Sequence, residues 1–186
     1  MSLATALEQS RTTLADRWVS AANAVYPFAT AGFLRTSPNA FANPVGQRSR
    51  ELADLLFRAV TGQAHDGNAL RAALEEFVRV RAIQDIPAEN ALAVIFAYKS
   101  ILRDFIRERN ITLTPEDDAL LLAVHERCDT LALLAFGIYT RVREVFFTAR
   151  IDDMRRRNSQ VMRLAKRHGL AVDALDETES TMDTAL

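Results

Sequence analysis

Apolar side chains recur at steps of three, four and seven residues along nearly the whole chain, which is the spacing of one face of an α-helix. The run after Pro87 shows this best: Ala91, Ile95, Tyr98, Leu102 and Phe105. Six glycines and five prolines occur among 186 residues, so turns are few. The spacing and the scarcity of turns together predict an all-α fold, a compact helical bundle of at least five helices with a long C-terminal helix.

Local signals place the ends of the predicted helices. They are Tyr26–Pro27, Asn43–Pro44, Gly62, Pro87 and Thr114–Pro115. A residue before proline is pushed out of the α region, proline fits the first helical position, and glycine adopts the left-handed conformation that ends a helix. We therefore expect one helix over about residues 3–26, and we expect Asn43 to cap the helix that follows it.

The last predicted helix begins at Pro115 and is unusually long. If it remains helical to His168, it measures roughly 80 Å at 1.5 Å per residue, which exceeds a compact domain. It must therefore either project or break near Asn158–Ser159. Its apolar stripe from Leu120 to Val145 is longer than one compact domain can cover, so we expect this helix to join two copies as a homodimer.

Composition divides the chain into three parts. Residues 1–150 are expected to form the helical domain, residues 151–168 a projecting basic helix, and residues 169–186 a disordered acidic tail. The apolar residues of the basic helix do not make a continuous core stripe, so it gains little by packing on its own domain. Four of its arginines are assigned to docking of a protein partner: Arg155, Arg156, Arg157 and Arg163. A merely solvated helix end is the alternative.

Charge and hydropathy exclude several classes of partner and location. The formal net charge is −1, so no global basic field indicates a nucleic-acid partner. No apolar run approaches the ~18 residues that a membrane helix needs, so we expect no membrane span. The N-terminus lacks the basic and apolar segments of a secretory signal. A single cysteine, Cys128, fits a reducing compartment and predicts a cytoplasmic protein.

Motifs of catalytic chemistry are missing from the sequence. It holds no Gly-x-Ser-x-Gly elbow, no phosphate-binding glycine loop and no HExxH. Paired acids such as Asp152–Asp153 lie on predicted charged helix faces, where solvation explains them. We therefore expect no catalytic residues and a protein that is not an enzyme.

Histidines could supply a metal or haem ligand, and His65, His125 and His168 are the three present. None belongs to a spaced set of Cys and His, so we expect no metal site. His125 precedes Cys128 by three residues, which places both on one helix face. They could ligate a metal or haem there, or they could be an exposed histidine beside a small buried cysteine. We expect no cofactor, with haem on His125 as the alternative.

A polar cluster interrupts the apolar stripe before Pro87. Arg81 lies on the apolar face of its predicted helix, Asp85 follows one turn later, and Gln84 lies between them. Arg81 and Asp85 at this spacing can form a salt bridge, and a partly buried pair needs the further hydrogen bonds that Gln84 could supply. This polar corner is interpreted as a structural network between two helices, and a ligand-binding or signalling site is the alternative.

The same stretch carries a resemblance to a known family. The string Arg79-Val80-Arg81-Ala82-Ile83-Gln84-Asp85, followed by Pro87 and the helix with Phe96 and Lys99, resembles the N-terminal domain family of the RsbT co-antagonist proteins, RsbRD type. Trp18, Tyr26-Pro27 and Asn43-Pro44-Val45-Gly46 fit the same pattern. The resemblance covers roughly residues 10–150.

The resemblance implies a globin-like sensory domain, usually without haem, that dimerises and passes a signal through its final helix to an output domain. The expected architecture is thus a globin-like or an orthogonal helical bundle. In co-antagonists the output domain is a STAS domain that the RsbT kinase phosphorylates, and this chain shows no such domain after its exit helix. The helix from Pro87 to Arg109 also has no histidine where globins place their proximal one.

From these observations we expect a stand-alone, non-enzymatic sensory, regulatory or adaptor protein that acts by protein–protein interaction. Its expected partners are a second copy of the chain and an unidentified protein, with or without a small apolar ligand. The alternative is a haem or other redox protein that uses His125, and an absorption spectrum distinguishes the two.

Overall fold

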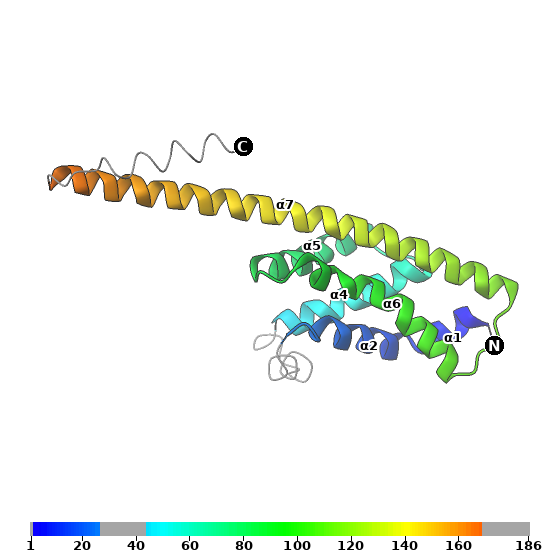
Figure 1. Ribbon diagram of the computed structural model, residues 1–186. Coiled ribbons are helices and arrows are strands. Elements are labelled where there is room, and N and C mark those ends of the chain that lie inside the picture. The colour runs from blue at the N-terminus through cyan, green and yellow to red at the C-terminus, as the bar shows by residue number, and fades with distance from the viewer. Residues whose placement is uncertain (1, 27–43, 169–186) are drawn as a thin grey trace. The chain divides into compact units, whose positions relative to one another are not determined.

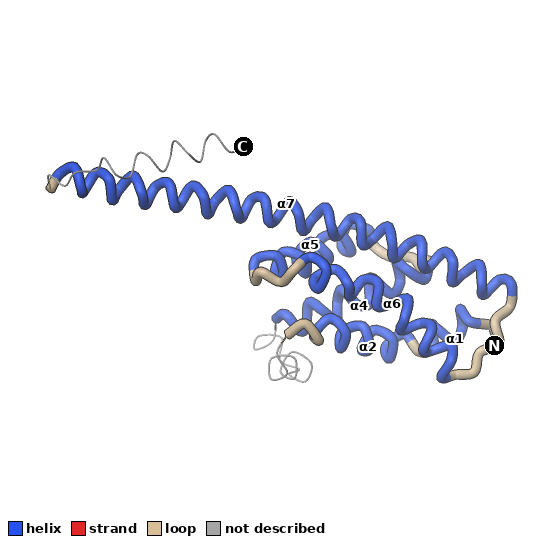
Figure 2. Tube along the Cα trace, in the orientation of Figure 1, coloured by secondary structure: helices blue, strands red, loops and turns tan. Residues whose placement is uncertain are grey.

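The computed structural model describes residues 2–26 and 44–168, and all regular elements in these ranges are α-helices (Figure 1, Figure 2). They are α1 (Leu3–Gln9), α2 (Arg11–Asn23), α4 (Pro44–Thr61), α5 (Gly67–Ile83), α6 (Ala88–Glu108) and α7 (Pro115–Arg167). The predicted all-α fold with a long C-terminal helix is confirmed. The predicted cap Asn43 and the acidic residues 169–186 lie outside the described residues.

The chain divides into two units, Met1–Arg143 and Glu144–Leu186, which we call unit 1 and unit 2. Unit 1 holds the helices α1 to α6 and the first part of α7, whereas the described part of unit 2 consists of the rest of α7 and His168. The helix α7 spans 53 residues without a break at Asn158–Ser159, which was one of the two outcomes expected for it.

Four helices of unit 1 enclose an aromatic cluster. The helix α2 packs against α4 and α6, and α5 packs against the same two helices. Trp18 is fully buried among them, its ring centroid 5.5 Å from that of Phe77 and 6.1 Å from that of Tyr98. Its Nε1 donates to the carbonyl of Val94 at 2.9 Å, and the Tyr98 hydroxyl donates to the carbonyl of Ala53 at 2.8 Å. Because these polar groups are satisfied, the rings can be buried without an unpaired donor.

The first part of α7 packs onto these helices. Its buried side chains include Val124, Cys128, Leu131, Ala135 and Ile138. Arg127 Nη1 donates to the carbonyl of Val60 at 3.0 Å, near the end of α4. Much of the apolar stripe of α7 that we expected to form the dimer contact is therefore buried against the chain's own core. Val145, at the end of that stripe, is exposed.

A capping box begins α7 and ties it to the N-terminus. Thr114 Oγ1 accepts from the Asp117 amide at 3.3 Å, and Asp117 Oδ2 accepts from the Thr114 amide at 3.1 Å. The other oxygen, Oδ1, accepts from the amide of Leu3 at 3.0 Å, in α1. The hydrogen bond from the Thr114 amide, together with that from Leu3, lowers the pKa of Asp117. The predicted boundary at Thr114–Pro115 is confirmed.

Two further helix ends test the local signals. Gly62 has φ +78° and ends α4 in the left-handed conformation, as predicted. The single helix expected over residues 3–26 is instead two, because Ser10 (φ −105°, ψ 11°) interrupts it between α1 and α2. Serine competes for backbone hydrogen bonds and so disfavours a helix interior, which explains the position of this break.

Candidate functional site

Arg81 is the centre of the polar corner, and it is 1 % exposed. Its Nη2 donates to the carbonyl of Ala22 at 3.0 Å, at the C-terminal end of α2, and its Nη1 donates to the carbonyl of Phe77 at 3.3 Å. The guanidinium lies over the Phe77 ring at 3.4 Å and 5.6 Å from the Tyr26 ring centroid. Burial lowers the pKa of Arg81 to about 10. The cation thus caps α2 and is held by carbonyls and aromatic faces.

The prediction of an ion pair between Arg81 and Asp85 is wrong. Asp85 follows the end of α5 with φ +57°, and its side chain pairs with Arg143 of α7. Among the described residues, no carboxylate pairs with Arg81. The helical spacing of four residues did not apply because α5 ends at Ile83, before Asp85 is reached. Gln84 does join the corner, since its Oε1 accepts from the Tyr26 hydroxyl at 3.0 Å.

Two residues of α7 hold the turn between α5 and α6. Arg143 Nη1 donates to the carbonyl of Ala82 at 3.0 Å, in addition to its pairing with Asp85. The Tyr139 hydroxyl donates to the carbonyl of Ile86 at 2.8 Å. The corner therefore connects the end of α2, through Arg81, with the last part of α7 in unit 1. Sequence reasoning missed Arg143 and Tyr139, because neither carries a local signal of a partner more than 50 residues away.

A buried amide lies beside this corner. Asn23 is 1 % exposed, and neither its Oδ1 nor its Nδ2 has a hydrogen-bond partner in the described part of the chain. It directly follows Ala22, whose carbonyl binds Arg81. An unsatisfied buried amide is costly, so the end of α2 combines a desolvated cation with a desolvated polar group.

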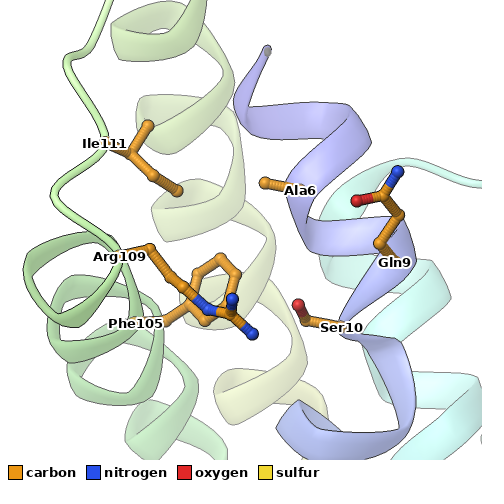
Figure 3. A pocket seen from close by; sticks show the side chains of 6 residues that line it. All are labelled: Ala6, Gln9, Ser10, Phe105, Arg109 and Ile111. Carbon is orange, nitrogen blue, oxygen red and sulfur yellow. The ribbon is translucent and has the colours of Figure 1, made fainter.

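A cavity of about 380 Å³ lies where α1, α2 and the end of α6 meet (Figure 3). Its lining consists of Ala6, Gln9, Ser10, Phe105, Arg109 and Ile111. Figure 3 shows Arg109 extending toward Ser10 across the ring of Phe105, and the Arg109 guanidinium carbon is 5.9 Å from that ring's centroid. The break at Ser10, which sequence reasoning did not foresee, thus helps to form the cavity. Its volume suits a small ligand, and its lining offers apolar side chains together with the cationic Arg109.

An apolar patch lies on the surface of unit 1, and we define it by the exposed side chains of Phe96, Leu133 and Phe136. The ion pair between Lys99 of α6 and Asp129 of α7 places these helices side by side here. Phe96 lies one turn from Lys99, and Leu133 lies one turn from Asp129, so exposed apolar side chains of both helices lie near this ion pair. Clustered exposed apolar side chains are typical of a protein–protein contact.

The four arginines assigned to partner docking are all exposed on α7 in unit 2: Arg155, Arg156, Arg157 and Arg163. Arg157 pairs with Asp153 one turn before it, at 2.7 Å. Consecutive helical positions point in different directions, so the structure does not bring these four arginines together on one face.

A family model, that of the RsbT co-antagonist protein RsbRD N-terminal domain, matches residues 12–154. The chain belongs to this family. The match confirms the resemblance carried by the polar corner, and it identifies a regulatory domain of the stress-signalling co-antagonist type. No curated protein and no solved structure matches the chain.

Within this RsbRD N-terminal domain, the matched range contains the whole polar corner together with Tyr139 and Arg143. It ends at residue 154, immediately before the first of the docking arginines, Arg155. The corner is thus part of the family's domain, whereas the second half of unit 2's helix belongs to the chain beyond it.

The residues proposed for the haem alternative do not fit haem. A haem ligand must lie in a buried apolar slot, but the His125 side chain is exposed on α7. Cys128 is fully buried, and burial raises the pKa of its thiol to about 11. In the described ranges, no three His, Cys, Asp or Glu side chains converge as a metal site would require.

Over the same residues, no helix combines the length and the apolar character needed to cross a membrane.

Proposed function

We propose that this protein is a non-enzymatic regulatory adaptor of the cytoplasm, in which unit 1 receives a signal and α7 presents it to a separate protein. The observation that carries the proposal is the continuity of α7 from Pro115 to Arg167. Its first part contributes Val124, Cys128 and Ile138 to the core of unit 1, and its last part is exposed. A continuous helix with one packed end and one exposed end can transmit a displacement of its packing.

The route that we propose for the signal runs through the polar corner. Arg81 contacts the end of α2, and the turn after α5 is held by Arg143 and Tyr139 of α7. A change in the packing of α2 would alter the position of Arg81. It would therefore also alter the turn between α5 and α6, which Arg143 and Tyr139 of α7 contact. Packed side chains, hydrogen bonds and rigid helices that have two arrangements can carry coupling between distant sites.

We place the expected homodimer contact on the apolar patch of unit 1. Phe96, Leu133 and Phe136 are exposed, and a twofold axis through such a patch would bury it against its own copy. Light scattering at micromolar concentration should report a dimer, and Leu133→Glu should convert it to a monomer. Ile83→Glu, at an exposed apolar residue of α5, is the matched control and should leave the dimer intact.

We place the expected small ligand in the cavity beside Ser10. The apolar part of its lining, Ala6, Phe105 and Ile111, has room for an aliphatic chain, and the Arg109 guanidinium favours a carboxylate at the end of that chain. A medium-chain fatty acid should raise the melting temperature of the protein, and the corresponding alcohol should do so less. Arg109→Gln should abolish this difference.

The test of the adaptor function is truncation after Arg150. Unit 1 has its own core, so the shortened protein should keep its helical circular dichroism and its dimer. It should lose the partner that the whole chain recovers from native cells. Recovery of the same partner by the truncated protein would move docking to unit 1. An absorption spectrum with a haem band in the purified protein would revive the haem alternative.

A further inference from the structure

The exposed end of α7 carries a regular apolar spacing. In unit 2 the positions follow steps of four, three, four, three and four residues: Phe147, Ile151, Met154, Asn158, Val161 and Ala165. Because α7 continues through Asn158–Ser159, these six positions share one helix face. At about 100° per residue they fall within an arc of about 80°. We call this face the exit seam. Three of the apolar residues that seemed discontinuous along the sequence, Ile151, Met154 and Val161, are thus aligned on this face, with Asn158 occupying one position.

The exit seam is open to solvent where its large side chains lie. Ile151, Met154 and Val161 are 45 %, 55 % and 59 % exposed. Steps of four and three residues repeat every 3.5 residues, the period with which one α-helix packs against another in a left-handed coiled coil. The period therefore indicates that the occupant of the seam is a helix.

Charges beside the seam define the chemistry of that helix. Arg150 and Arg157 lie along one edge of the seam, and Arg155 lies along the other. Of the acids of the same segment, Asp152 lies on the opposite side of the helix, and Asp153 lies behind Arg157, with which it pairs at 2.7 Å. The edges that would contact a partner helix thus hold three arginines and no acid.

These edges disfavour a second copy of the same segment as the occupant. In a parallel pair, Arg150 would face Arg155 of the other copy. In an antiparallel pair, the charged edge residues would again be arginine against arginine. Like charges at these positions oppose pairing and select against a partner, whereas acids opposite them would favour it.

We propose that the exit seam binds an amphipathic α-helix of another protein, with apolar residues at heptad spacing and Asp or Glu along both edges. Asn158 sets the register by requiring a polar residue opposite it. The proposal rests on the adaptor function and names the chemistry of its partner. It also divides the four docking arginines, because Arg155 and Arg157 border the seam while Arg156 and Arg163 lie on the far side.

The binding test uses the full chain and synthetic peptides. The probe is a fluorescent three-heptad peptide with Leu and Ile in its seam, one Asn, and Glu at every edge position. A control peptide carries Lys in place of each Glu, and a second control has the same composition in scrambled order. Fluorescence anisotropy should show the acidic peptide binding at least tenfold more tightly than either control, and its binding should weaken as salt rises.

Matched variants locate the binding. Ile151→Asp should weaken binding at least tenfold, whereas Val145→Asp, which adds the same charge at an exposed apolar residue off the seam, should not. Arg155→Glu should weaken binding by several fold, and Arg156→Glu should change it less. Circular dichroism verifies that each variant remains helical.

Other outcomes overturn the proposal. Equal binding of the acidic and basic peptides would show that charge does not select the partner. Equal effects of Ile151→Asp and Val145→Asp would show that the peptide does not bind at the exit seam. If Ile151→Asp dissolves a dimer of the full chain and no peptide binds, the occupant is a second copy. If the acidic peptide binds after deletion of residues 170–186 but not before, the occupant is the chain's own acidic segment.

The adaptor function and the acidic-helix partner can be tested separately. If truncation after Arg150 loses the native partner but no acidic peptide binds, the adaptor function stands and the acidic-helix partner is wrong. If the peptide binds but truncation changes no native contact, the seam is real and the adaptor function is wrong.

Discussion

The two parts of α7 show what holds a helix in place. In unit 1 the helix buries Val124, Cys128 and Ile138 against its neighbours, and tertiary packing stabilises it. In unit 2 nearly all side chains are exposed, and the contacts are local ones such as the pair between Asp153 and Arg157. Such pairs contribute only ~0.2–0.5 kcal/mol each. The same helix is therefore part of a core in one unit and a presented surface in the other.

Arginine residues repeat this contrast. Arg81 in unit 1 is desolvated and bound to carbonyls and rings, so its removal affects the fold. Arg156 in unit 2 is exposed, so its removal should affect recognition at most. Substitutions in unit 1 should therefore change the free energy of unfolding, and substitutions in unit 2 should change binding.

The largest expected effect on stability is that of Trp18→Ala. The indole is fully buried between Phe77 and Tyr98, so its loss leaves a cavity and should cost ~3–5 kcal/mol of unfolding free energy. Ile151→Ala in unit 2 is the contrasting variant and should change stability by less than about 0.5 kcal/mol. Urea denaturation followed by circular dichroism measures both. Similar costs for the two variants would contradict the division into packed and presented parts.

Helix spacing was sufficient to predict the fold class, because buried residues such as Tyr98 and Leu102 lie where the apolar stripe placed them. Caps and stops were also readable at Gly62 and at Thr114–Pro115, since each depends on local chemistry. The break at Ser10 was missed, because serine disfavours a helix interior only slightly and its effect depends on tertiary packing.

A smaller loss is expected at Arg81. Arg81→Ala removes the cap of α2 and leaves a cavity, and it should cost on the order of 2–4 kcal/mol. Arg81→Met keeps the volume and loses the hydrogen bonds, so it should cost about 1–3 kcal/mol. Arg156→Met in unit 2 is the matched control and should cost less than about 0.5 kcal/mol. Equal costs for Arg81→Met and Arg81→Ala would show that packing contributes little.

The sequence indicated which residues make up the polar corner, but it did not predict most of their contacts. Arg81 is buried at the corner, since a charged residue on an apolar stripe is a sequence signal of a buried network, whereas Gln84 accepts from Tyr26 instead of bonding an Arg81–Asp85 pair. The partner of Asp85 could not be predicted, because its direction depends on where α5 ends and on a left-handed backbone conformation. Long-range partners such as Arg143 follow from tertiary structure alone.

Acid should act on unit 1 through Asp117. Its pKa is lowered in the folded state, so its stabilisation is fully present above the unfolded-state pKa and is lost as the pH falls through the lowered value. The urea midpoint of the whole chain should therefore fall between neutral pH and about pH 3. Asp117→Asn should lower the midpoint at neutral pH and flatten this dependence. An unchanged pH dependence would indicate that other carboxylates dominate acid unfolding.

The smallest effect is expected for Asp85→Asn, which tests how much the ion pair between the corner and Arg143 of α7 contributes to stability. Asparagine tolerates the positive φ of +57° at least as well as aspartate, so the substitution removes the charge and little else. The pair with Arg143 is open to solvent, with side-chain exposures of 63 % and 21 %, and such pairs contribute about 0–1 kcal/mol. The unfolding free energy should therefore fall by less than about 1 kcal/mol, less in 1 M salt than in dilute buffer, because salt screens the pair. Arg143→Met should cost more, because Arg143 also donates to the carbonyl of Ala82. If Asp85→Asn cost as much as Arg143→Met, the charge pair and not the carbonyl contact would hold the turn to α7.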